Sequence, residues 1–93
     1  MKINKITIIG AGSWGTTLAI LLGEKGYNIS LWARRKELAE EINSTKENKQ
    51  YLKNIKIPET VIATNSIKDA VIDSNIIVFA IPSEYLREVA KSF

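Results

Sequence analysis

The sequence contains no cysteine and no histidine. Without cysteine, the 93 residues can form no disulfide, no thiolate metal site and no thiol nucleophile. Without histidine, they lack the commonest general base and the commonest metal ligand in proteins. Hydrolytic and zinc chemistry are therefore poor candidates, and we assign no residue of this sequence a catalytic or metal-binding role.

Long runs of charge and membrane-spanning segments are also missing. The 13 Lys and Arg residues and the 10 Asp and Glu residues leave a net charge of +3, and the two signs are interleaved. The sequence has no basic stretch with interleaved aromatic residues, so we expect no nucleic-acid partner. The apolar window at 6–23 holds four glycines, which excludes a spanning helix. No signal-peptide pattern follows it, so we expect a cytoplasmic protein.

A glycine motif directly after an apolar run is the strongest positive signal. Gly10, Gly12 and Gly15 form the pattern Gly-x-Gly-x-x-Gly, and a helical pattern begins at once. In dinucleotide-binding folds the first glycine allows a tight turn and the second lets the backbone approach a pyrophosphate. The third lets the helix lie close to the strand. The motif therefore predicts a dinucleotide site, made by Gly10, Ala11, Gly12 and Gly15 at the N-terminus of a helix.

Two larger residues stand between the second and third glycines. Ser13 has a hydroxyl group and an N–H group to offer to a phosphate. Trp14 has two interpretations that the sequence leaves open. It forms a wall beside the pyrophosphate or the nicotinamide end, or it is the first member of a buried helical stripe that continues through Leu18, Leu21 and Leu22.

Alternating apolar runs and helical patterns predict an α/β chain. We expect strands at 5–9, 29–33, 61–64 and 76–81, and helices at 13–25, 35–46, 66–72 and from an N-cap at Ser83 onward. Residues 43–57 are expected to be irregular, with anchors at Tyr51, Leu52 and Ile55. The order predicts the N-terminal part of a Rossmann-type doubly wound parallel sheet with strand order 3-2-1-4.

The end of the second strand bears on the choice of cofactor. NAD-preferring domains place a carboxylate there, about 20 residues past the glycines, to accept a hydrogen bond from the ribose 2′-hydroxyl. This sequence has Arg34 and Arg35 instead, and arginine can hold a 2′-phosphate with paired charge-assisted bonds. The pattern favours NADP(H), while NAD(H) binding through the glycine turn stays open. Alternatively, both arginines are only the solvated start of a helix.

Two more residues are candidates for contact with the cofactor. Pro82 follows the fourth strand, at the carboxyl edge of the sheet where ligands dock in such folds. It also has a structural interpretation as the residue that stops the strand. Tyr51 either reaches over the adenine side or anchors its own loop.

The sequence ends at Phe93 inside an apolar helical stripe, and its most apolar strand, 76–81, would lie at a sheet edge. We therefore expect residues 1–93 to be one dinucleotide-binding domain of a longer protein, without the substrate domain. An exposed apolar edge also predicts self-association, unless a further strand covers it.

Residues 10–19, followed by 31–35, resemble the bacterial-type NAD(P)-dependent glycerol-3-phosphate dehydrogenases, and the resemblance continues at 48–52, 57–58 and 77–83. It implies that Ser13, Trp14, Arg34 and Arg35 contact the cofactor. Lys53 stands where that family commonly has proline.

The resemblance also implies an activity, the reversible transfer of hydride between NAD(P)H and dihydroxyacetone phosphate. The product is sn-glycerol 3-phosphate, for phospholipid synthesis. The family's catalytic lysines and helical substrate domain match no part of these residues, so we expect the chain alone to bind cofactor without turnover. A stand-alone NADP(H) sensor and the cofactor domain of a related reductase, such as ketopantoate reductase, are the alternatives.

Overall fold

The computed structural model describes residues 2–91, with only the backbone described for residues 83 and 84. Its elements, in chain order, are β1 (Lys5–Ile9), α1 (Ser13–Glu24), β2 (Asn28–Trp32), α2 (Lys36–Thr45), β3 (Glu47–Asn48), β4 (Leu52–Lys56), β5 (Val61–Thr64), α3 (Ile67–Val71), β6 (Ile76–Phe79) and α4 (Ser83–Ala90).

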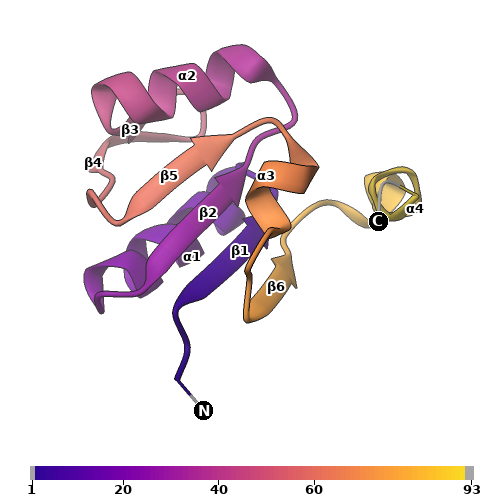
Figure 1. Ribbon diagram of the computed structural model, residues 1–93. Coiled ribbons are helices and arrows are strands. Elements are labelled where there is room, and N and C mark those ends of the chain that lie inside the picture. The colour runs from indigo at the N-terminus through magenta and orange to yellow at the C-terminus, as the bar shows by residue number, and fades with distance from the viewer. Residues whose placement is uncertain (1, 92–93) are drawn as a thin grey trace.

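Four strands form one parallel sheet in the order β5-β2-β1-β6 (Figure 1). Counted among these four strands alone, that order is 3-2-1-4, so the predicted topology is confirmed. In the register, Ile6 of β1 lies between Ile29 of β2 and Ile76 of β6. The chain order reverses at β1, because β2 and β5 lie on one side of it and β6 on the other.

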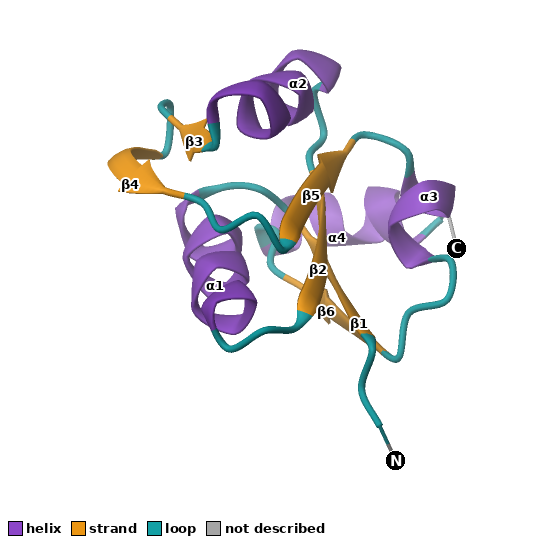
Figure 2. Cartoon of the chain, turned by 60° about the vertical axis from the view of Figure 1, so that its left-hand side comes forward, coloured by secondary structure: helices purple, strands orange, loops and turns teal. Residues whose placement is uncertain are grey.

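Helices cover both faces of this sheet. Helices α1 and α2, with the β3–β4 hairpin, lie on one side, and α3 lies on the other (Figure 2). On the first side, Ile8 and Leu31 are fully buried in the main core. On the second side, Val89 of α4 and Ala70 of α3 pack with Ile9 and Trp32 of the sheet. The two layers of helices are what a doubly wound sheet requires.

Helix α1 buries a different face from the one that its large residues predict. Trp14 is 66% exposed and Leu21 is 53% exposed, while the buried residues are Gly15, Thr16, Ala19, Ile20 and Gly23. The reason is close packing. A Cβ atom on Gly23 would stand 2.8 Å from Thr60 Oγ1 and 2.9 Å from a methyl group of Val61. The small residues let the helix approach the sheet. The predicted stripe is therefore wrong at Trp14 and Leu21, and the inward-packed interpretation of Trp14 is wrong, while Leu18 and Leu22 are partly buried against the main core as expected.

The segment after α2 is more ordered than the sequence predicts. It forms the antiparallel β3–β4 hairpin, which packs beside α1. Asn48 and Ile57 are fully buried here, whereas Ile55 and Tyr51 are 45% and 42% exposed. The anchors of this segment are therefore Asn48 and Ile57, together with the partly buried Leu52.

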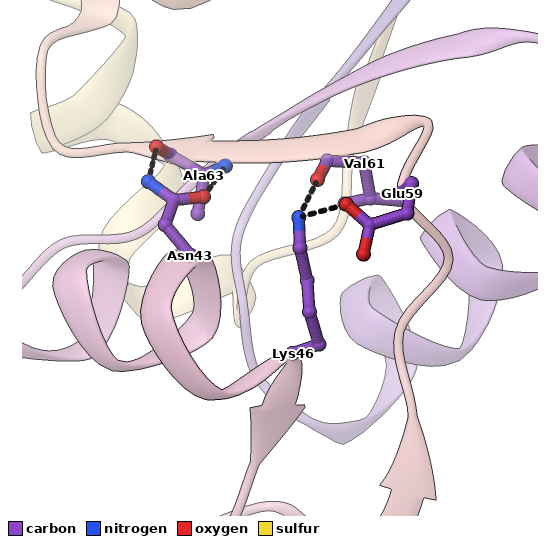
Figure 3. Close-up of polar contacts among 5 residues, drawn as sticks. All are labelled: Asn43, Lys46, Glu59, Val61 and Ala63. Carbon is purple, nitrogen blue, oxygen red and sulfur yellow. Dashed lines mark hydrogen bonds and ion pairs between the residues drawn. The ribbon is translucent and has the colours of Figure 1, made fainter.

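The two edges of the parallel sheet differ in how their strands are covered. At β5, Asn43 of α2 donates to the carbonyl oxygen of Ala63 and accepts from its N–H, both at 2.8 Å (Figure 3). Lys46 reaches the carbonyl oxygen of Val61 at 3.4 Å and lies 3.6 Å from the Glu59 carboxylate. These side chains take the place of a neighbouring strand.

At the other edge, β6 presents apolar side chains to solvent. Ile76, Ile77 and Phe79 are each 38–45% exposed. The strand ends at Phe79, two residues before the predicted end. Pro82 occupies the N-cap position of α4 and Ser83 is the first residue of that helix, so the expected N-cap at Ser83 is wrong by one position.

Within residues 2–91, no helix has both the length and the apolar character that crossing a membrane requires.

Candidate functional site

The turn between β1 and α1 needs two of its three glycines for the protein's own packing. Gly10 has a φ of +124°, and a Cβ atom there would stand 2.4 Å from the Ala80 carbonyl oxygen. At Gly15, a Cβ atom would stand 1.8 Å from the Gly10 carbonyl oxygen. The Gly10 N–H donates to Trp32 O at 3.0 Å, which ties the turn to the end of β2. Internal contacts therefore account for Gly10 and Gly15.

Gly12 has no such internal explanation. Its φ of −78° and ψ of −166° are open to any residue, and no atom lies within 4 Å of the position of a Cβ. It is the N-cap of α1, so the N–H groups that follow belong to the first turn, where helices leave donors without internal partners. A glycine with open space beside it, at a helix N-terminus, leaves room for another molecule to approach the backbone.

A pocket of about 310 Å³ opens at this turn. Seven of the ten residues predicted to contact cofactor line it, namely Gly10, Ala11, Gly12, Arg34, Arg35, Tyr51 and Pro82. The structure adds Trp32, Leu38, Ala80, Ile81, Tyr85 and Val89. The pocket thus lies at the carboxyl ends of β1, β2 and β6, where the chain order reverses, and this is the place where open α/β sheets bind ligands.

The two arginines stand at the mouth of the pocket in defined contacts. The guanidinium carbon of Arg34 lies 4.7 Å from the centre of the Tyr85 ring, and its Nη2 lies 3.5 Å from Glu88 Oε1. Arg35 donates to the side-chain oxygen of Gln50. Two cations and one carboxylate leave the mouth with an excess of positive charge, which favours an anionic ligand.

The predicted residues Ser13, Trp14 and Gly15 are placed beside the pocket, outside its lining. The Ser13 hydroxyl donates to the carbonyl oxygen of Tyr51 at 3.1 Å, so it binds the loop in this structure. The backbone of Tyr51 therefore helps to anchor the loop, and Tyr51 also lines the pocket. The role of Trp14 as a wall beside a ligand stays a prediction.

Sequence reasoning missed Tyr85, which lines the pocket, and Asn48, which donates a hydrogen bond to the carbonyl oxygen of Ala11 in the pocket lining. Asn48 is a single polar residue in a polar segment, and nothing local marks it as fully buried. Tyr85 lies in the predicted last helix, and its contact with Arg34 joins residues 51 positions apart. Its place in the first turn after the fourth strand, at the carboxyl edge of the sheet, was the available signal.

A second, larger hollow of about 640 Å³ lies over the ends of β1, β2 and β5 away from the glycine turn. Its lining begins at Lys5, Asn28 and Glu59, near the amino ends of those strands, and continues along β5 to Thr64. It includes no residue of the glycine turn. In the part of the chain that the structure describes, no group of three or more Asp and Glu residues is placed to hold a metal ion.

A parallel sheet with helices on both faces, a glycine turn and a pocket at the reversal of strand order define a Rossmann-type nucleotide-binding domain. The family model described as "NAD-dependent glycerol-3-phosphate dehydrogenase N-terminus" matches residues 5–93. The chain belongs to this family.

Curated relatives and solved structures agree with the family. A glycerol-3-phosphate dehydrogenase [NAD(P)+] from Chlorobium phaeobacteroides is 49% identical over 89 residues, which are 96% of this chain and 27% of the relative. One from Bacillus thuringiensis is 42% identical over 94% of this chain and 26% of its own length. The chain therefore spans about a quarter of the length of these relatives.

Two relatives of known structure have the same fold over nearly the whole chain. The glycerol-3-phosphate dehydrogenase of Coxiella burnetii superposes with a TM-score of 0.92 at 34% identity, covering 97% of this chain and 28% of that one. That of Saccharomyces cerevisiae gives 0.89 at 36% identity, covering 98% and 30%.

Proposed function

We propose that the pocket binds the adenosine diphosphate half of a nicotinamide dinucleotide, with the diphosphate against the backbone of Gly12. The observation that carries this proposal is the contrast among the glycines. Gly10 and Gly15 are required by contacts within the protein, and Gly12 is not. A ligand that must approach the backbone closely supplies the missing reason for glycine at this position. The dependence on NAD(P)+ in the names of the relatives supports the same ligand.

The size and charge of the site fit this half of the cofactor. A volume of about 310 Å³ is at the lower end for ligand pockets, so it suits one nucleotide better than the whole dinucleotide. Trp32, Ile81 and Val89 give it an apolar wall. Arg34 and Arg35 stand where an adenosine ribose would end, and they favour NADP(H) through a 2′-phosphate.

We further propose that the whole protein transfers hydride reversibly between NAD(P)H and dihydroxyacetone phosphate, as the names of its relatives indicate for them. The cofactor supplies the hydride when bound, while the protein must add an acid/base group and a substrate pocket. We assign neither to these 93 residues. The domain therefore holds the cofactor, and a substrate domain outside this sequence completes the enzyme. Its cytoplasmic location stays a prediction.

Thermal protection tests the proposed function directly. A ligand that binds only the folded chain at 100 times its dissociation constant stabilises it by about 2.7 kcal/mol, which for a domain of this size raises the Tm by roughly 10–20 °C. We expect NADPH to produce such a shift and NADH a smaller one at equal concentration. If neither dinucleotide changes the Tm, the proposed function is wrong.

A further inference from the structure

We propose that Asn48 is a positioning residue for dinucleotide binding, because it fixes the peptide group that presents the Gly12 N–H. This inference rests on the proposed function. Asn48 is fully buried between the hairpin and α1. Its side-chain nitrogen donates to the Ala11 carbonyl oxygen and to Thr16 Oγ1, both at 2.8 Å. Its side-chain oxygen accepts from the Tyr51 N–H at 3.4 Å.

These bonds converge on one carbonyl group. The Ala11 oxygen also accepts from the Thr16 hydroxyl at 3.2 Å, so two donors hold it on the inner side of the turn. The Ala11 carbonyl and the Gly12 N–H belong to the same planar trans peptide and point in opposite directions. When Asn48 holds the oxygen inward, the Gly12 N–H is aimed outward, away from the protein interior. That is the direction from which we propose the diphosphate approaches.

The chemistry of the amide suits this task. The side-chain NH₂ group has two donors, and each finds an acceptor here. A carboxylate of the same shape would have no proton to offer and would face the Ala11 oxygen at close range. An apolar residue would leave Ala11 O with the Thr16 hydroxyl alone. Asparagine therefore holds the turn without bringing a charge near a site for an anion.

A role in folding alone is the competing explanation, because Asn48 also ties the hairpin to α1. Asn43 provides a matched control. Its amide makes a similar pair of bonds, to the N–H and the carbonyl oxygen of Ala63, but at the outer edge of the sheet (Figure 3). Asn43→Asp and Asn48→Asp both lose their amide donors, and only Asn48 contacts the glycine turn.

The test compares these variants by calorimetry, well below their melting temperatures, with NADPH and NADH as probes. We expect Asn48→Asp to weaken both dinucleotides by the same factor, roughly ten- to a hundredfold, the worth of one charge-assisted hydrogen bond. The factor is shared because both cofactors carry the diphosphate. Asn43→Asp should bind like the unmodified chain. In amide NMR spectra of the free protein, the Gly12 resonance should move in Asn48→Asp, while that of Tyr85 should not.

The outcomes separate this inference from the proposed function. If the unmodified chain binds neither dinucleotide, the proposed function fails. If it binds both and folded Asn48→Asp binds them equally well, only the positioning role is wrong; equal losses in the two Asp variants would also overturn it. Should Asn48→Asp not fold, Thr16→Val removes one of the two donors to the Ala11 oxygen. A several-fold loss of both cofactors then supports the inference, and unchanged affinity overturns it.

Discussion

Replacement of Gly12 by alanine should weaken ligand binding while leaving the stability of the fold nearly unchanged. The added methyl group meets no atom within 4 Å, and the backbone angles suit an alanine. A glycine-to-alanine change at a compatible position stabilises by about 0.4–1 kcal/mol through the unfolded state. Alanine is a poorer N-cap than glycine, by an amount on the order of several tenths of a kcal/mol. The two effects nearly cancel, so the Tm should change by only a few degrees.

Affinity should respond very differently. The methyl group would stand between the backbone and the diphosphate, and the loss of one charge-assisted hydrogen bond costs about 1.5–3 kcal/mol. Since about 1.4 kcal/mol is a factor of ten, Gly12→Ala should weaken NADPH and NADH by roughly ten- to a hundredfold. Gly12→Val, with a larger side chain, should abolish detectable binding of both cofactors.

Gly26→Ala is the matched control. A Cβ atom there also meets no atom within 4 Å, but Gly26 has a φ of +97°. We expect a loss of about 1–2 kcal/mol of stability and unchanged cofactor affinity. The assay is calorimetric titration of both variants, with melting curves beside it. Wild-type affinity in folded Gly12→Ala, or a loss that merely tracks a fall in Tm, would refute the assignment of the diphosphate to this turn.

Three further predictions concern the cofactor, the reaction and the sheet edge. Replacing Arg34 and Arg35 together by alanine should weaken NADPH by at least tenfold more than NADH in a fluorescence titration; equal losses would count against a 2′-phosphate contact. The 93-residue chain alone should not oxidise NADPH when dihydroxyacetone phosphate is added, and a fall in absorbance at 340 nm proportional to protein concentration would contradict this. Ile77→Lys should reduce concentration-dependent association in sedimentation experiments, because it places a charge on the exposed face of β6; a chain that is monomeric at every concentration would show that β6 does not mediate contacts between copies.

The parallel sheet could be predicted because its signals are local. β-branched runs mark β1 and the glycine motif marks the turn after it. The spacing to β2 is that of a βαβ unit, whose crossover has a known handedness. The same local reasoning placed Arg34 and Arg35 at the pocket, since a residue that follows a strand must lie at its carboxyl edge.

The buried face of α1 could not be predicted from hydrophobicity, because size decides it. The close approach to Thr60 and Val61 admits glycine and excludes larger residues at position 23. Trp14 and Leu21 are consequently left outside. The small residues Gly15, Ala19 and Gly23, spaced four apart, mark the face of α1 that packs on the sheet more reliably than the larger apolar residues do.

The remaining parts of the site depend on contacts between distant segments. Asn48 is buried only because the hairpin folds back on α1. Tyr85 meets Arg34 only because β6 is placed beside β1. Neither contact has a local pattern that a single sequence reveals. The sequence could have placed Tyr85 at the carboxyl edge of the sheet, but its contact with Arg34 and the burial of Asn48 are seen only in the tertiary structure.

The amide of Asn43 has a consequence for how this sheet can be enlarged. It satisfies both backbone groups of Ala63, so an incoming strand at β5 would have to displace it and would gain little. The β6 edge, which presents exposed apolar side chains, is therefore the edge at which we expect a further strand to pair. Such a strand would move the pocket at the carboxyl ends of β1, β2 and β6 away from the margin and toward the middle of the sheet, where residues from both flanks would reach the nucleotide.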